Sequence, residues 1–327
     1  MDKEYSFSIE EIESHIQDLP AKGITELSVH DETFAGNKNR ILKFADSAYK
    51  KAPDIFYTIL IDASIVDREI INAFSKLFCS LEIPLNCKDK NGHLLFDKKF
   101  YASKARLLNE SGIVFGFQLT YARNSSDTLK LFFERLDFAV QQYPNHIDFP
   151  QIENNEIQAS VTGFFSAQDI RHARDTAFST RTFYSAGRAV PWFLSILKPL
   201  KIYPSRFFED FAEWQRCNNC DFKSGFSPEA EKHEAIEKMQ LLFIEEKYEE
   251  KKCHEFLNAA LDIIKINGAY SRLVGEGEES IVETSYNPDD LFGPEAMDLK
   301  LFVENVCMEN CRTKFFINGN NPDYAIE

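Results

Sequence analysis

The first 153 residues alternate between short apolar runs and longer runs whose apolar residues have helical spacing, and this alternation constrains the fold most strongly. In the run over 9–19, Ser8 and Glu11 fit a capping box, and Gly23 follows the helix. The predicted strands cover 24–29, 56–61, 81–86, 113–121 and 146–152, and the predicted helices cover 9–19, 39–51, 67–77, 100–111 and 127–142. With short connections, this alternation predicts an α/β fold: a parallel sheet, barrel or open, with helices packed outside it.

Beyond residue 153 this alternation of strands and helices ends, and longer helical patterns follow. The predicted helices cover 166–183, 189–200, 204–216, 228–251 and 253–267, a loop or short hairpin covers 270–288, and a last strand covers 313–317. We therefore predict two domains, a partial (β/α) barrel over 1–160 and a mostly helical C-terminal region over 161–327.

Aromatic residues are concentrated at the start of the second domain. They are Phe183, Tyr184, Trp192, Phe193, Phe207, Phe208, Phe211 and Trp214. At helical spacings such a run predicts a packed core rather than a cofactor site. It would also suit the cover of an open side of a partial barrel.

The charge balance argues against nucleic acids and anionic membranes as partners. The chain has 37 Lys and Arg against 52 Asp and Glu, a formal net charge of −15 at pH 7, which repels both at long range. It has no apolar run of about eighteen residues, and its first four residues, MDKE, do not resemble a signal peptide. We therefore expect a cytoplasmic protein in which the seven cysteines are reduced thiols.

Four segments of the first domain carry a resemblance to a known family. They are GITELSVHDETF over 23–34, YTILIDASIVDREII over 57–71, LLNESGIVFGFQ over 107–118 and PNHIDF over 144–149. In this order and spacing they resemble the second and later β/α units of a radical S-adenosylmethionine (SAM) enzyme, most closely the cobalamin-associated class. The region from Phe165 onward resembles the tail that follows the barrel in some members. The resemblance implies a partial barrel of the radical SAM type and SAM as a ligand.

The cysteine motif of that family is missing from these 327 residues. In the family, a C-x3-C-x2-C loop after the first strand holds a four-iron cluster, and SAM takes the open iron site. Here the first cysteine is Cys79, and no three cysteines have that spacing. Two interpretations stay open: the cluster segment lies on a longer or separate chain, or the protein is a degenerate relative that has lost radical chemistry.

Two late cysteine pairs offer an alternative metal site. Cys217 and Cys220 have the C-x2-C spacing, and Cys307 and Cys311 have the C-x3-C spacing. Four thiolates suit zinc or an auxiliary iron–sulfur cluster if the fold brings them together. Four reduced thiols without a metal are the alternative interpretation.

In parallel α/β barrels, ligands bind at the carboxyl ends of the strands. Polar residues at those ends are therefore candidates for a SAM or substrate pocket: Asp31, Glu32, Asp62, Asn86, Lys88, Gln118, Tyr121, Asp148, Gln151 and Glu153. Asp31, Glu32 and Asp62 also suit helix caps. Lys88 suits an anion such as the SAM carboxylate, or a solvated lysine-rich face.

The sequence is compatible with three functions. The first is a non-catalytic radical-SAM-like protein that binds a small molecule or acts as a partner subunit. The second is the SAM- or substrate-binding body of a split or truncated enzyme, whose cluster or cobalamin domain a protein partner supplies. The third is a metal-binding module built on the late cysteines. The chain is a radical enzyme only in the second case, because SAM cleavage needs the cluster.

Overall fold

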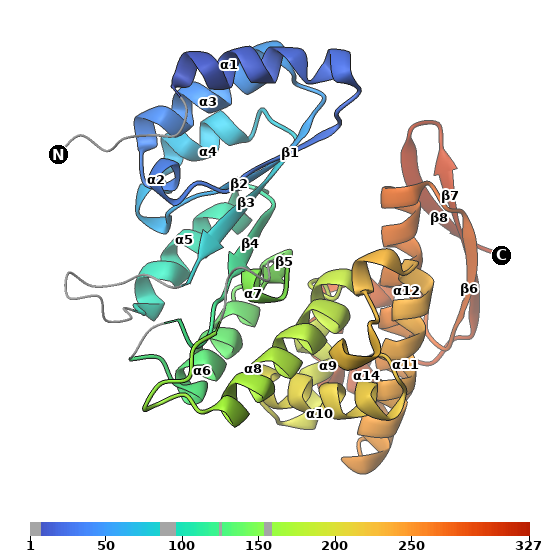
Figure 1. The fold of residues 1–327 in the computed structure, drawn as a ribbon. Coiled ribbons are helices and arrows are strands. Elements are labelled where there is room, and N and C mark those ends of the chain that lie inside the picture. The colour runs from blue at the N-terminus through green and yellow to red at the C-terminus, as the bar shows by residue number, and fades with distance from the viewer. Residues whose placement is uncertain (1–7, 86–95, 124–125, 154–158) are drawn as a thin grey trace. The chain divides into compact units, whose positions relative to one another are not determined.

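The computed structural model describes residues 8–85, 96–123, 126–153 and 159–327. The chain forms two compact units, Met1–Phe165 (unit 1) and Ser166–Glu327 (unit 2) (Figure 1). The sequence pattern had placed this division after residue 160.

Unit 1 alternates between strands and helices as the sequence pattern predicts. Its elements are α1 (Ile9–Asp18), η1 (Pro20–Lys22), β1 (Glu26–Val29), α2 (Glu32–Ala35), α3 (Lys38–Lys51), β2 (Phe56–Leu60), η2 (Ala63–Ile65), α4 (Arg68–Phe74), β3 (Cys79–Pro84), α5 (Lys98–Glu110), β4 (Phe115–Gln118), α6 (Leu129–Val140), β5 (His146–Asp148) and α7 (Pro150–Glu153).

The five strands form one parallel sheet in the order β1-β2-β3-β4-β5. This confirms the predicted α/β fold with a parallel sheet. Within the described part of unit 1, β1 and β5 each pair with one neighbouring strand, so the structure shows an open sheet and not a closed barrel.

The two faces of this sheet differ in character. Helices cover one face, where Phe44 of α3 packs against Tyr57 and Tyr101 of α5 packs against Phe117 (Figure 1). Because side chains alternate along a strand, the residues between these apolar ones lie on the opposite face. That face carries mostly polar side chains, namely Ser28, Thr58, Ser80, Glu82, Gln118, His146 and Asp148.

Unit 2 combines helices with a small sheet. Its elements are α8 (Ala167–Thr180), η3 (Arg181–Ala186), α9 (Phe193–Leu200), α10 (Pro204–Cys217), η4 (Phe222–Ser224), η5 (Pro228–Ala230), α11 (His233–Glu250), η6 (His254–Phe256), α12 (Leu257–Glu276), β6 (Ser280–Thr284), α13 (Pro288–Leu291), η7 (Pro294–Met297), α14 (Leu299–Asn305), β7 (Cys311–Asn318) and β8 (Asn321–Ile326).

The end of unit 2 differs from the sequence prediction. The segment 270–288 was expected to be a loop or short hairpin, yet α12 continues through Glu276 and ends at Gly277, whose φ of 70° forms a left-handed cap. Buried Ala269 and Leu273 extend the apolar face of α12 this far. After it, β6 pairs with β7 and β7 pairs with β8, both antiparallel, so the mostly helical region contains a three-stranded sheet.

The aromatic run forms the core of unit 2. The Phe183 ring lies 4.8 Å from that of Phe207, 5.0 Å from that of Phe211 and 6.2 Å from that of Phe243, centre to centre. Phe183 belongs to η3, a π-helical turn that frees backbone carbonyls from the regular helical pattern. The buried Gln240 side chain donates to the carbonyls of Phe183 and Gly187, at 2.7 and 3.0 Å, and so satisfies them.

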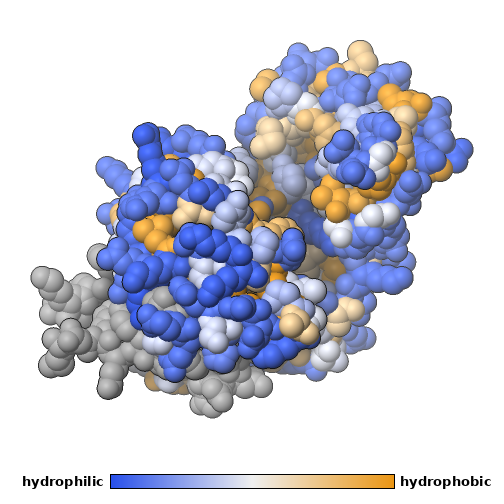
Figure 2. Space-filling view, turned by 90° about the horizontal axis from the view of Figure 1, so that it is seen from above, coloured by the Kyte–Doolittle hydropathy of each residue, from blue (hydrophilic) through white to orange (hydrophobic). Residues whose placement is uncertain are grey.

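On the face drawn in Figure 2, hydrophilic residues predominate and hydrophobic ones form small separate groups. Among the described helices, none has the length and apolar character needed to cross a membrane.

Candidate functional site

The polar face of the unit 1 sheet lines a cavity of about 400 Å³. We call it the sheet cavity, and its lining residues are Ser28, His30, Phe56, Thr58, Ser80, Glu82, Val114, Gln118, His146 and Asp148. Its volume lies in the usual range of small-molecule pockets, roughly 300–1,000 Å³. All five strands, or the residues beside them, contribute to this one surface.

Three side chains converge within the sheet cavity. The imidazole Nε2 of His146 makes a short contact with the Oε1 of Glu82, and it lies 3.2 Å from the Oδ2 of Asp148. In the sheet register Glu82 pairs with Gly116, and Gly116 pairs with His146. A Cβ on Gly116 would collide with the His146 ring. Glycine at this position therefore allows the imidazole to reach from β5 across β4 to the carboxylate on β3.

Glu82 is the most enclosed member of the group, with its side chain 3% exposed. Burial raises the pKa of Glu82, but the hydrogen bonds and charges of the neighbouring groups, with His146 first and then Asp148 and His30, together lower it further. The net direction is down, so the carboxylate form is favoured. The Oε2 of Glu82 and the Oγ of Ser80 are buried and have no hydrogen-bond partner in the described part of the chain.

Two of the ten predicted pocket residues line the sheet cavity. Gln118 ends β4 and Asp148 ends β5, and the two residues are directly paired in the sheet register. Asp31 and Asp62 instead serve as helix caps, the alternative that the sequence also allowed. Asp31 accepts from the backbone N–H groups of Thr33 and Phe34, and Asp62 accepts from that of Ser64.

Tyr121 and Gln151 lie together but do not line the sheet cavity. The Gln151 side chain accepts from the Tyr121 N–H at 2.8 Å and donates to the Tyr121 carbonyl at 2.5 Å, which ties α7 to the segment after β4. The Tyr121 ring is buried against Phe132.

The remaining predicted pocket residues are not placed. Asn86 and Lys88 lie outside the described residues. Glu32 and Glu153 belong to α2 and α7, but the positions of their side chains are not described.

The four late cysteines do not gather into a ligand group. Among the described residues, the group of three potential ligands whose donor atoms all lie within 4.8 Å of one another is Glu82, His146 and Asp148. Cys217 and Cys307 are exposed, while Cys311 is buried. Burial, followed by nearby carboxylates, raises the pKa of both Cys220 and Cys311. This disfavours the thiolate form that binds metals.

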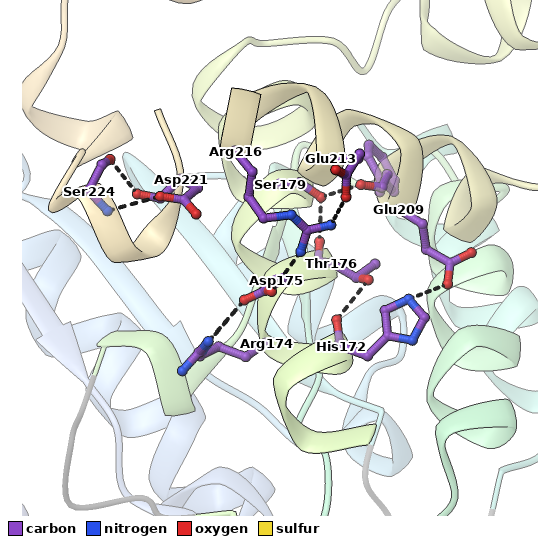
Figure 3. A network of polar contacts seen from close by, with 11 residues as sticks. His172, Arg174, Asp175, Thr176, Ser179, Glu209, Glu213, Arg216, Asp221 and Ser224 are labelled. Atoms are coloured by element: carbon purple, nitrogen blue, oxygen red, sulfur yellow. Dashed lines mark hydrogen bonds and ion pairs between the residues drawn. The ribbon is translucent and has the colours of Figure 1, made fainter. Parts of the chain in front are cut away.

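A network of polar contacts connects α8 with α10, the helix that ends at Cys217 (Figure 3). Asp175 accepts from both Arg174 and Arg216, each at 3.1 Å. His172 pairs with Glu209 at 2.6 Å, and that hydrogen bond raises the pKa of His172. These contacts join two neighbouring helices.

Glu82, His146 and the hydroxyl residues of the sheet cavity were not among the residues predicted from the sequence. A signal for them was present, because Ser80 and Glu82 alternate with apolar residues along a predicted strand. In a sheet covered on both sides such a charge would be costly, so it indicates a functional or open face.

No family model matches the chain, and no curated protein matches it. Two solved structures of the radical S-adenosylmethionine methyltransferase TsrM from Kitasatospora setae resemble it, both with a TM-score of 0.35 and 13% identity. One holds cobalamin and an iron–sulfur cluster, and the other holds tryptophan substrate and the SAM analogue aza-SAM. Each likeness covers 43% of this chain and 30% of that protein, so the chain spans under a third of its length.

Proposed function

We propose that this protein binds a small polar molecule in the sheet cavity of unit 1, and that SAM is the first ligand to test. The observation that carries the proposal is the row of polar side chains from all five strands around a cavity of about 400 Å³. Small-molecule pockets are concave and combine apolar surface with a few converging polar groups, as this cavity does.

The cavity offers the partners that a molecule such as SAM requires. Ser28, Thr58 and Gln118 provide hydrogen-bonding groups for its polar ends. Phe56 and Val114 add apolar surface for an adenine or similar ring. The sequence resemblance to radical SAM enzymes supports the same ligand.

We favour binding over radical chemistry as the role of this chain. The residues present do not fit a four-iron cluster, because no three cysteines have the C-x3-C-x2-C spacing. The described cysteines also form no ligand group. A protein partner that carries a cluster or a cobalamin domain would provide the chemistry in the alternative case.

The test is calorimetric titration of the anaerobically purified full chain with SAM, S-adenosylhomocysteine and methionine, together with iron and sulfide analysis. We expect SAM to bind and the iron content to be negligible. Gln118→Leu and Thr58→Val should each weaken binding about tenfold, the equivalent of one hydrogen bond of about 1.4 kcal/mol. Gln141→Leu, at the exposed end of α6, is the matched control and should bind as the wild type does.

Two results would contradict the proposal. If none of the three ligands releases heat, the cavity does not bind this class of molecule. If iron approaches four per chain, the cysteines build a cluster and the radical-enzyme alternative replaces the binding role.

A further inference from the structure

The group formed by Glu82, His146 and Asp148 has the donor atoms of a metal site. It offers one imidazole nitrogen and two carboxylate oxygens, all within 4.8 Å of one another. Zinc ligands lie about 2.1 Å from the ion, so in a tetrahedral site they are about 3.4 Å apart. The His146 Nε2 to Asp148 Oδ2 distance of 3.2 Å is close to that spacing, and the shorter contact of Nε2 with the Glu82 Oε1 would have to lengthen when an ion binds.

The enclosed carboxylate is a second and independent indication. The Glu82 side chain is 97% buried in the sheet face, and its Oε2 has no partner among the described residues. A buried carboxylate oxygen without a partner is destabilising, so native structures rarely keep one without an ion or water. Glu82 lines the cavity, and a cation there would satisfy this atom.

The strands of the sheet position the three side chains next to one another. The three residues lie on β3 and β5, and Gly116 of the intervening strand makes room for the His146 ring. Strands of a packed sheet hold side chains more rigidly than loops do, which suits a preorganised site. With a neutral imidazole the group carries two negative charges, and a divalent cation neutralises them.

We propose that Glu82, His146 and Asp148 bind a divalent transition-metal ion such as Zn²⁺ or Mn²⁺ on the floor of the sheet cavity. Imidazole with carboxylates suits these ions, whereas the group has no thiolate to favour copper(I). Three protein ligands leave at least one coordination position open toward the cavity, the pattern of metal sites that bind a water or a substrate. This inference does not rest on SAM as the ligand.

A metal-free triad is the competing account. In it, a protonated His146 lies between the two carboxylates and supplies the positive charge itself. The two accounts predict opposite outcomes when metal is added.

The test uses the full chain stripped with a chelator and titrated with Zn²⁺, and with Mn²⁺ as a spectroscopic probe. Exposed Cys217 and Cys307 are changed to serine so that their thiolates do not bind zinc. We expect one equivalent to bind, and Glu82→Gln and His146→Gln each to weaken binding at least tenfold. His172→Gln is the matched control, because His172 also pairs with a carboxylate but lies in unit 2; it should leave binding unchanged.

A measurement on the unmutated site covers the case in which a variant fails to fold. Electron spin-echo spectroscopy of bound Mn²⁺ should detect one imidazole nitrogen. No bound metal, a spectrum without imidazole, or undiminished binding by folded His146→Gln would each overturn the metal site in favour of the metal-free triad. Thr58→Val and Gln118→Leu should weaken SAM binding without weakening Zn²⁺ binding. Failure of the SAM proposal can therefore be distinguished from failure of the metal site.

Discussion

Asp127 and Arg135 form a buried ion pair in unit 1, with side chains 4% and 0% exposed. The Asp127 carboxylate lies 3.1 and 3.3 Å from the Arg135 Nη2, and it also accepts from the backbone N–H groups of Ala122 and Thr128. Ala122 has a left-handed backbone, φ 52°, immediately after buried Tyr121. The Asp127 carboxylate therefore has two roles: it holds the loop after β4 in place and it neutralises the Arg135 guanidinium.

We predict that Asp127→Ala destabilises the protein by about 3–5 kcal/mol, because it removes the carboxylate that neutralises a buried guanidinium. Arg135→Met should be milder, since Asp127 keeps its two backbone donors and the new side chain fills apolar space. Chemical denaturation of both variants measures the difference. If both variants lose the same free energy of unfolding, the unneutralised charge of Arg135 is not the cause of the destabilisation.

At the residue scale the sequence identified caps better than it identified the site. Asp31 and Asp62 precede their helices directly, so their roles are local and visible in the pattern. Glu82 and His146 are 64 positions apart, and only the parallel register brings their side chains together. Asp148 was identified because it ends a strand, but its partners depend on pairing that residue spacing does not encode.

At the scale of elements, α11 and α12 are joined by a buried polar cluster. The guanidinium of Arg272 donates to the Nδ1 of His233 at 3.1 Å and to Glu237 at 2.5 Å. Burial, together with the charges of Arg188 and Arg272, lowers the pKa of His233 from 6.5 to about 4. The imidazole therefore stays neutral in the folded protein at mildly acidic pH.

From this shift we predict the direction of a pH effect. Between pH 6.5 and about 4 the unfolded chain binds a proton on His233 that the folded chain does not bind. The contribution of His233 to folding stability is therefore fully present above pH 6.5. It decreases as the pH falls, by up to about 3 kcal/mol. In His233→Gln, folding stability should decrease less as the pH falls. The exposed control His254→Gln should show the same decrease as the wild type. Denaturation midpoints from pH 4 to 7 test this, and an unchanged slope in His233→Gln would contradict it.

The elements themselves were largely predictable, and the exceptions have physical causes. Apolar periodicity located the five strands of unit 1, because each strand buries one face under neighbouring helices. Gly275 and Gly277 suggested a loop, yet packing of Leu273 extends α12 to Glu276. Tertiary burial therefore outweighed the low helix propensity of one glycine.

At the scale of the whole molecule, each unit has its own core. Unit 1 is centred on the covered face of its sheet, and unit 2 on the Phe183 cluster. Both units have the size of independent domains. The alternating pattern predicted the parallel sheet, but closure into a barrel depends on strand contacts beyond this periodicity.

We predict that residues 1–165 and 166–327 fold when expressed separately, each with one cooperative thermal transition. Residues 1–140, which lack β5, serve as the control and should lose that transition or melt at a much lower temperature. Circular dichroism during heating measures all three. Unfolded separate units would mean that the two cores depend on one another.

The strand order of the unit 1 sheet follows the order of the chain, β1 to β5. During synthesis, each new strand can therefore dock on the edge left by the one before it, without waiting for a later segment to be inserted between them. Growth in this direction suits folding on the ribosome, where the amino-terminal part emerges first. The side chains of β3 and β5 that face the cavity would then meet only when the last strand is added.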